Sequence, residues 1–176
     1  MITLRLVVML LCGLFAALAQ ASANLLPWPP LQGKVMFSQA KMLQGLPVPL
    51  RSSGYLDIAP AQMLWHTTTP VESKLLITAM GVSQWQQQEY IAVTGSEFVG
   101  QLMLAVLQQN LEFIQQQFNL RQGDAHCTLL EPKQAPLDQL FSYIALCGET
   151  KLSQLSLQEK NGNSTVITLQ AEAVAQ

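Results

Sequence analysis

Apolar and polar residues alternate along short runs of this chain, and proline or glycine separates the runs. Within residues 53–78, Met63 and Trp65 lie two residues apart, and so do Leu75 and Ile77. Side chains two apart on a strand share one face of the sheet. Proline marks the breaks because it cannot donate a ladder hydrogen bond. This pattern predicts short strands that place bulky apolar groups on one face.

The same pattern continues through most of the chain and predicts an antiparallel sheet. The expected strands are Lys34–Met42, Pro49–Ile58, Met63–Thr67, Ser73–Thr78, Tyr90–Val93, Cys127–Glu131, Tyr143–Cys147, Leu152–Lys160 and Thr165–Gln170. The Gln-rich run Gln84–Glu89 is polar apart from Trp85, and we expect it to be a hairpin tip. Asn161-Gly162 predicts a type I′ turn before the last strand.

Helices are expected only in the middle of the chain and in one short turn. Thr94 and Glu97 have the spacing of a capping box, and the helix that follows runs to about Leu107. It has almost no polar side, which predicts that it is buried on more than one side or closes over something apolar. Leu111–Phe118 is amphipathic, and Leu137–Leu140 predicts a short helical turn.

Together these elements predict an α+β fold. We expect a strongly curved antiparallel sheet that forms an incomplete, half-open β-barrel, with the helices lying in its mouth as a lid. Asn24–Gln32 contains three prolines and therefore cannot form a helix.

The first 23 residues have the features of a secretory signal peptide. Arg5 precedes the apolar run Leu6–Ala19, and Ala21-Ser22-Ala23 is a small-residue cleavage site. We expect residues 24–176 to form a single domain in the periplasm. The formal net charge of −2, with scattered basic residues, argues against nucleic-acid binding.

Two cysteines, Cys127 and Cys147, follow the predicted signal peptide. In an exported protein the first interpretation is a disulfide, here between neighbouring strands. A metal site that includes His126 is the competing interpretation, but it lacks a fourth ligand and a CxxC spacing.

We find no motif that indicates catalysis. Asp57 and Glu72 are single acids, and no nucleophile elbow, phosphate loop or HExxH motif is present. His66 alternates with Trp65, so we expect a surface histidine that points away from the apolar face. The prediction is therefore that the protein is not an enzyme and needs no cofactor or metal, although a hydrolase is the weakest of the alternatives.

A set of residues between Val35 and Trp85 resembles a known family. The set consists of Gly54, Pro60, Leu64, Trp65, His66, Pro70, Glu72, Ser73, Leu75 and Leu76. Their order is similar to that of the LolA family, the periplasmic carriers of outer-membrane lipoproteins. Phe37-x-Gln39 and the run Pro49–Gly54 are closer to a LolA-like branch found with aryl-polyene and related lipid pathways. The resemblance implies a half-barrel of the LolA/LppX type.

The chain departs from this family at two places. The family usually opens with an amphipathic helix packed on the sheet, whereas Asn24–Gln32 is rich in proline, so we expect part of the apolar face to be more open. The family usually has Arg before the proline of the Gly54–Pro60 strand, where it bonds the lid helices, and this chain has Ala59. The resemblance therefore implies a divergent, pathway-specific carrier.

The predicted function is a periplasmic carrier that binds lipid or lipoprotein acyl chains in the half-barrel. The candidate lipid-binding residues are Phe37, Met63, Trp65, Leu75, Ile77, Phe98, Leu102 and Val106. Methionine suits a surface that must fit flexible chains, although each of these residues taken alone is better explained as core. The expected partners are the cargo, an inner-membrane exporter and an outer-membrane acceptor, and we expect a monomer. The alternative is a periplasmic scaffold subunit that binds no lipid.

Overall fold

The structure is a computed structural model, and it describes residues 26–124 and 126–171. The strands are β1 (Gly33–Met42), β2 (Leu50–Ala59), β3 (Gln62–Thr69), β4 (Ser73–Thr78), β5 (Gly81–Gln86), β6 (Glu89–Ala92), β7 (Phe118–Gln122), β8 (Cys127–Pro132), β9 (Phe141–Cys147), β10 (Gln154–Glu159) and β11 (Ser164–Ala171). The helices are α2 (Glu97–Gln108), α3 (Leu111–Gln117) and α4 (Leu137–Leu140). The predicted signal peptide lies outside the described residues. Within them, no helix has the length and apolar character needed to cross a membrane.

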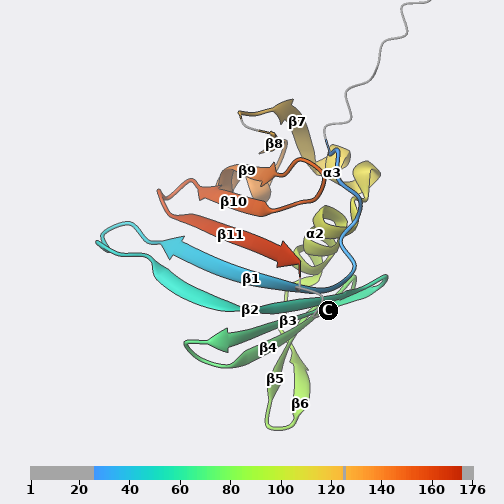
Figure 1. The fold of residues 1–176 in the computed structure, drawn as a ribbon, viewed down its shortest axis with the longest axis vertical. Helices are drawn as coiled ribbons and strands as arrows, with labels where there is room; N and C mark the ends of the chain where they lie inside the picture. The colour runs from blue at the N-terminus through green and yellow to red at the C-terminus, as the bar shows by residue number, and fades with distance from the viewer. Residues whose placement is uncertain (1–25, 125, 172–176) are drawn as a thin grey trace, which may run out of the picture.

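The strands form one eleven-stranded antiparallel sheet in the order β6-β5-β4-β3-β2-β1-β11-β10-β9-β8-β7 (Figure 1). From β1 to β6 each new strand is added next to the preceding one, toward one edge of the sheet. Helices α2 and α3 connect that edge to β7 at the other edge, and strands β7 to β11 are then added in order back toward β1. The last strand then pairs with the first, with Phe37 opposite Leu169. Because β6 and β7 remain edges, the sheet is strongly curved but not closed into a barrel, as the sequence predicted.

The helices cover one face of the sheet, which we call the concave face (Figure 1). Directly opposite residues of antiparallel strands share a face, so the face continues from Leu56 to its partner Trp65 and on to Leu75. The apolar stretch Leu104–Leu107 of α2 is buried against it. Burial on more than one side explains why this helix has so few polar positions.

The proline-rich segment before β1 is extended, as expected, and it contributes to the core. Leu26 and Trp28 are buried in the main core cluster. The backbone N–H of Leu31 donates to the carbonyl of Leu107 at 2.9 Å, and the side chain of Gln109 donates to the carbonyl of Trp28. Two large side chains of this segment therefore belong to the core, although the segment is not a helix.

The hairpin tip predicted within Gln84–Glu89 is present, whereas the turn type predicted at Asn161-Gly162 was wrong. Gln87 and Gln88 both have positive φ (49° and 70°) and join Gln86 to its partner Glu89, which is the type I′ pattern. The expected type I′ turn at Asn161-Gly162 instead has a positive φ only at Gly162 (86°), in a three-residue loop. The polar Gln-rich run is also mostly strand, because β5 extends to Gln86.

The region around the helices contains two further differences. The second helix stops at Gln117, and Phe118 begins β7, a strand that was not predicted. The capping box is absent: Ser96 occupies the N-cap without capping the helix, and its hydroxyl accepts from Val82 N–H at 2.8 Å. Tertiary contact with β5 has replaced the local cap.

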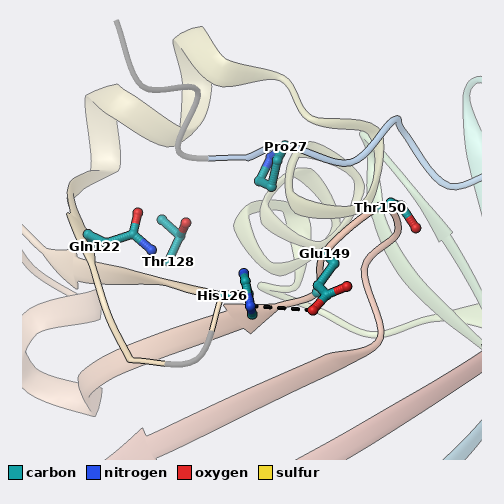
Figure 2. Close-up of a pocket in the computed structure, with 7 residues that line it drawn as sticks. Pro27, Gln122, His126, Thr128, Glu149 and Thr150 are labelled. Atoms are coloured by element: carbon teal, nitrogen blue, oxygen red, sulfur yellow. Dashed lines mark ion pairs between the residues drawn. The ribbon is translucent and has the colours of Figure 1, made fainter.

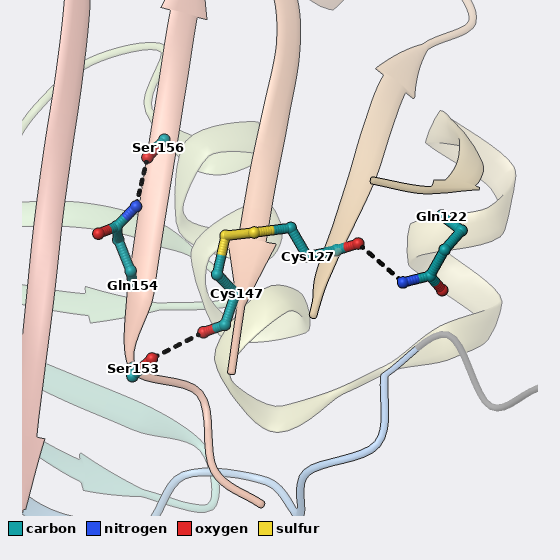
Figure 3. The surroundings of a disulfide bond; sticks show 6 residues. All are labelled: Gln122, Cys127, Cys147, Ser153, Gln154 and Ser156. Carbon is teal, nitrogen blue, oxygen red and sulfur yellow. Dashed lines mark hydrogen bonds between the residues drawn. A yellow bond between two sulfur atoms is a disulfide. The ribbon is translucent and has the colours of Figure 1, made fainter. Parts of the chain in front are cut away.

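The predicted disulfide is present between Cys127 and Cys147 (Figure 3). The two residues are direct partners on β8 and β9, with Cα atoms 4.0 Å apart. Their neighbours Thr128 and Leu146 are buried on the concave side, so the disulfide lies on the convex face of the sheet. It joins the strands on either side of the connection that contains α4.

Candidate functional site

A cavity of about 530 Å³ lies between the concave face, α2 and the α4 connection. The lining residues are Gln39, Leu56, Trp65, Gly95, Phe98, Val99, Leu102, Met103, Val106, Leu107, Pro136, Leu137, Leu140, Phe141, Ile144, Leu155, Leu157, Thr165, Ile167 and Leu169. Among these side chains only those of Gln39 and Thr165 carry hydrogen-bonding groups outside a ring. The cavity therefore offers apolar contact along nearly all its wall.

The sheet side of the cavity follows from strand register. Leu155 and Leu157 alternate along β10 and face the cavity together. Leu155 lies opposite Ile167, and Leu157 lies opposite Thr165. Because opposite residues share a face, β10 and β11 supply one continuous wall.

The helical side comes from a single stripe of α2. Phe98, Leu102 and Val106 are spaced four residues apart, so they stack along one face of the helix. Leu137 and Leu140 of α4 close the cavity on another side. The cavity is thus enclosed by α2, α4 and the sheet, and no cluster of hydrogen-bonded polar side chains lies within it.

Two of the lining residues locate the opening of the cavity. Val99 is 47% exposed and Leu140 is 54% exposed, although both line the cavity. Large apolar side chains that face both solvent and the cavity mark the place where it reaches the surface. We call this region the mouth.

The structure brings together four of the eight candidate lipid-binding residues. Trp65, Phe98, Leu102 and Val106 line the cavity. The other four lie in or against the core and do not line it, namely Phe37, Met63, Leu75 and Ile77. Phe37 nevertheless supports the wall, because its ring packs on that of Trp65 with centroids 5.0 Å apart.

The largest omission of the sequence reasoning is the C-terminal half of the wall. Leu155, Leu157, Ile167 and Leu169 were assigned to strands but not to a site. Their alternation at period two was a usable signal. The sequence did not reveal that β11 pairs with β1. This pairing brings these residues to the same cavity as Trp65 and α2.

Helix α2 is attached to turns of the sheet by side-chain amides. Gln108 donates to the backbone carbonyl of Ala59 at 2.8 Å, and Gln101 donates to that of Ala79 at 3.3 Å. Gly100 makes the closest approach: a Cβ there would lie 2.3 Å from the carbonyl oxygen of Thr78. The helix therefore rests directly on backbone at the turn between β4 and β5.

His66 lies on the convex face, but the prediction of a plain surface histidine was wrong. Its side chain is only 12% exposed. Tyr55 O–H lies 2.7 Å from Nδ1, and Nε2 lies 3.0 Å from Glu72 Oε1. The hydrogen bond from His66, followed by that from Lys74, holds the pKa of the exposed Glu72 below its usual 4.5. None of these residues lines either described cavity.

A second hollow of about 410 Å³ lies near the disulfide and is lined mainly by polar residues (Figure 2). His126 Nε2 and Glu149 Oε1 are 3.3 Å apart there, but both side chains are more than 60% exposed. The cysteine next to His126 is bonded to Cys147, which removes it as a metal ligand. In residues 26–124 and 126–171, no three His, Cys, Asp or Glu side chains are grouped for a metal.

Comparison with known proteins places the chain in a family. A family model described as the outer membrane lipoprotein carrier protein LolA matches residues 32–175. The chain belongs to the LolA family. No curated protein sequence matches it.

Two of the solved structures that match the chain are distant in sequence. A LolA superfamily protein from Nitrosomonas europaea, NE2245, is 7% identical with a TM-score of 0.49, over 83% of this chain and 87% of that one. LprF from Mycobacterium bovis is 13% identical with a TM-score of 0.39, over 82% of this chain and 88% of that one.

The residue before Pro60 contacts helix α2 through its backbone. Where the resemblance implies an Arg that reaches from the sheet to the helices, the sheet offers only the backbone carbonyl of Ala59. Gln108 reaches it from the helix instead.

Proposed function

We propose that this protein is a periplasmic carrier that shields an acyl or polyene chain in the cavity while the cargo passes between the inner and outer membranes. The observation that carries the proposal is an almost wholly apolar cavity, open at one end, between Trp65 and the stripe of α2. An exporter would load the monomeric carrier and an outer-membrane acceptor would unload it.

The size of the cavity favours a small cargo. A methylene group takes about the volume of a water molecule, roughly 30 Å³, so about 530 Å³ corresponds to roughly one 16-carbon chain. Burying such a chain completely is worth roughly 12 kcal/mol, which is close to nanomolar affinity. Since a carrier must also release its cargo, a single chain, partly exposed at the mouth, suits the task.

Movement of α2 provides a route for entry. The helix contributes Phe98, Leu102 and Val106 to the wall, and its side-chain bonds to the sheet are neutral amides. Outward movement would break few bonds and expose the stripe to incoming cargo. The scaffold alternative assigns no role to the cavity.

The first test is native mass spectrometry of the protein purified from the periplasm of its own host, with extraction of any bound lipid. We expect a discrete added mass that extracts as an acylated or polyene species. If the measured mass is that of the mature chain alone, and the protein does not bind a fluorescent fatty acid, the scaffold alternative is favoured instead.

A matched pair of variants tests the site itself. Leu102→Trp places a larger apolar group in the cavity, so fluorescent fatty-acid binding should fall at least tenfold. Gln116→Trp adds the same side chain to the exposed side of α3 and should bind as the wild type does. Equal binding by both folded variants would contradict the assignment of the cavity.

A further inference from the structure

The hairpin between β1 and β2 ends in an apolar tip that nothing in the structure covers. The tip carries the exposed side chains of Met42, Leu46, Val48 and Leu50. Val48 is 65% exposed and Leu50 is 53% exposed. Exposed apolar residues grouped on one projecting loop mark a surface that meets another apolar medium.

The tip is held in shape by its own backbone and by the neighbouring turn. Pro47 and Pro49 restrict the loop, and Leu46 N–H donates to the carbonyl of Leu43 at 3.0 Å. Gln44 N–H donates to Oδ1 of Asn163, in the turn between β10 and β11, at 2.9 Å. A preorganised loop loses little conformational entropy when it docks.

Cations surround the base of this tip. Lys41 and Arg51 flank it, and residues 40–51 contain no acid. Lys160 lies in the adjacent turn, and Glu159, 3.8 Å from Lys41, is the acidic residue there. An apolar tip with a cationic collar complements the interface of an anionic bilayer, where acyl chains lie beneath phosphate groups.

The Leu140 side of the mouth lies on the same rim of the sheet. Thr165 lines the cavity and is the direct strand partner of Lys41. Leu140, at the mouth, accepts a hydrogen bond through its carbonyl from Lys160 N–H at 2.9 Å. Figure 1 shows the β1–β2 tip and the β10–β11 turn projecting together on one side.

We propose that the β1–β2 tip inserts into the surface of an anionic phospholipid bilayer, with Lys41, Arg51 and Lys160 at the headgroups. Insertion brings the Leu140 side of the mouth toward the membrane, so a chain enters or leaves the cavity there without crossing water. Membrane binding by the tip does not depend on the carrier function. Its use in cargo exchange does, and this part rests on the proposed function.

The test is flotation of the mature protein with vesicles of phosphatidylcholine alone or with phosphatidylglycerol. We expect more binding to the phosphatidylglycerol vesicles, and weaker binding as salt is added. Leu46→Ser combined with Val48→Ser should lower the bound fraction about tenfold or more, because two buried apolar side chains are lost. Lys41→Gln with Arg51→Gln should remove the preference for phosphatidylglycerol.

Met80→Ser is the control, because Met80 is 84% exposed on the opposite rim, at the turn between β4 and β5. It should float as the wild type does. Absence of wild-type flotation, or equal flotation of the Leu46 and Val48 double variant, would overturn the proposal, as would tip-dependent capture of a protein without vesicle binding.

Fatty-acid binding by the same variants separates the two proposals. The tip variants should keep wild-type affinity for a fluorescent fatty acid, because neither Leu46 nor Val48 lines the cavity. Vesicle binding without any fatty-acid binding would remove the carrier function and leave the membrane-binding tip in place.

Discussion

Replacing Gly100 by alanine sets two opposing effects against each other in α2. On helix propensity alone, Gly→Ala inside a helix stabilises by about 1 kcal/mol. The structure predicts instead that this substitution lowers the stability of the protein. A Cβ at Gly100 would lie 2.3 Å from the carbonyl oxygen of Thr78 and 2.9 Å from Cα of Gly81.

The magnitude follows from the shift that this overlap requires. Ordinary contact begins at 3.4 Å, so α2 must move by about 1 Å from the β4–β5 turn. Both opposing atoms belong to the backbone and cannot rotate away. Overpacking typically costs about 1–3 kcal/mol, and we take the upper half of that range because neither atom can move aside. After subtraction of the gain in propensity, about 1 kcal/mol, we expect Gly100→Ala to destabilise by about 1–2 kcal/mol.

Urea unfolding followed by circular dichroism measures this difference, provided that the slope of the transition is unchanged. Gln116→Ala, on the exposed side of α3, is the control and should stay within about 0.5 kcal/mol of wild type. A shifted α2 should also exchange a bound fluorescent fatty acid faster. If Gly100→Ala unfolds at the same or higher urea concentration than wild type, the close packing of α2 on the turn is refuted.

Three further changes test the core, the disulfide and the convex face. Met63→Ala should cost about 2–5 kcal/mol, because Met63 is fully buried, and should leave fatty-acid affinity unchanged; weaker binding would place Met63 in the site. Serine at both Cys127 and Cys147 should cost about 3 kcal/mol in urea unfolding, since 20 residues separate the two cysteines, and a loss below about 1 kcal/mol would contradict the chain-entropy account. Because the pKa of Glu72 is lowered from 4.5, its ionised form adds stability above that pH, which is lost as the pH falls through the lowered pKa. Glu72→Gln should therefore melt below wild type at neutral pH and together with it in acid, and a gap that does not change with pH would refute this.

The sequence predicted the strands of the sheet well wherever apolar and polar side chains alternate from one residue to the next. The strand that contains Met63 and Trp65 is clear because large apolar residues alternate with polar ones. Alternation was a poor guide at Gln84–Gln88, where a polar strand and a tight turn have the same composition. Phe118 was assigned to a helix because it continues the helical spacing of Leu111 and Ile114, whereas pairing with Pro132 on β8 makes it strand.

Half of the predicted site residues line the cavity, for the same reason. Leu102 was selected from an apolar helix stripe and Trp65 from an alternating strand, and both line the cavity. Met63 has the same local signature as Trp65 and shares its face, yet it is core. The difference lies only in what packs above each residue, which is a property of the assembled fold.

The sequence by itself determined the local features of this protein: where most strands begin and end, which helix is buried, and which cysteines are available to pair. These follow from side-chain periodicity and backbone constraints that act over a few residues. Only the tertiary structure decided that β11 pairs with β1, that Leu26 and Trp28 cover the core, and where the cavity opens. Pairing across more than 130 residues, as between Phe37 and Leu169, depends on the summed fit of a whole sheet and its helices, and no local pattern encodes that fit.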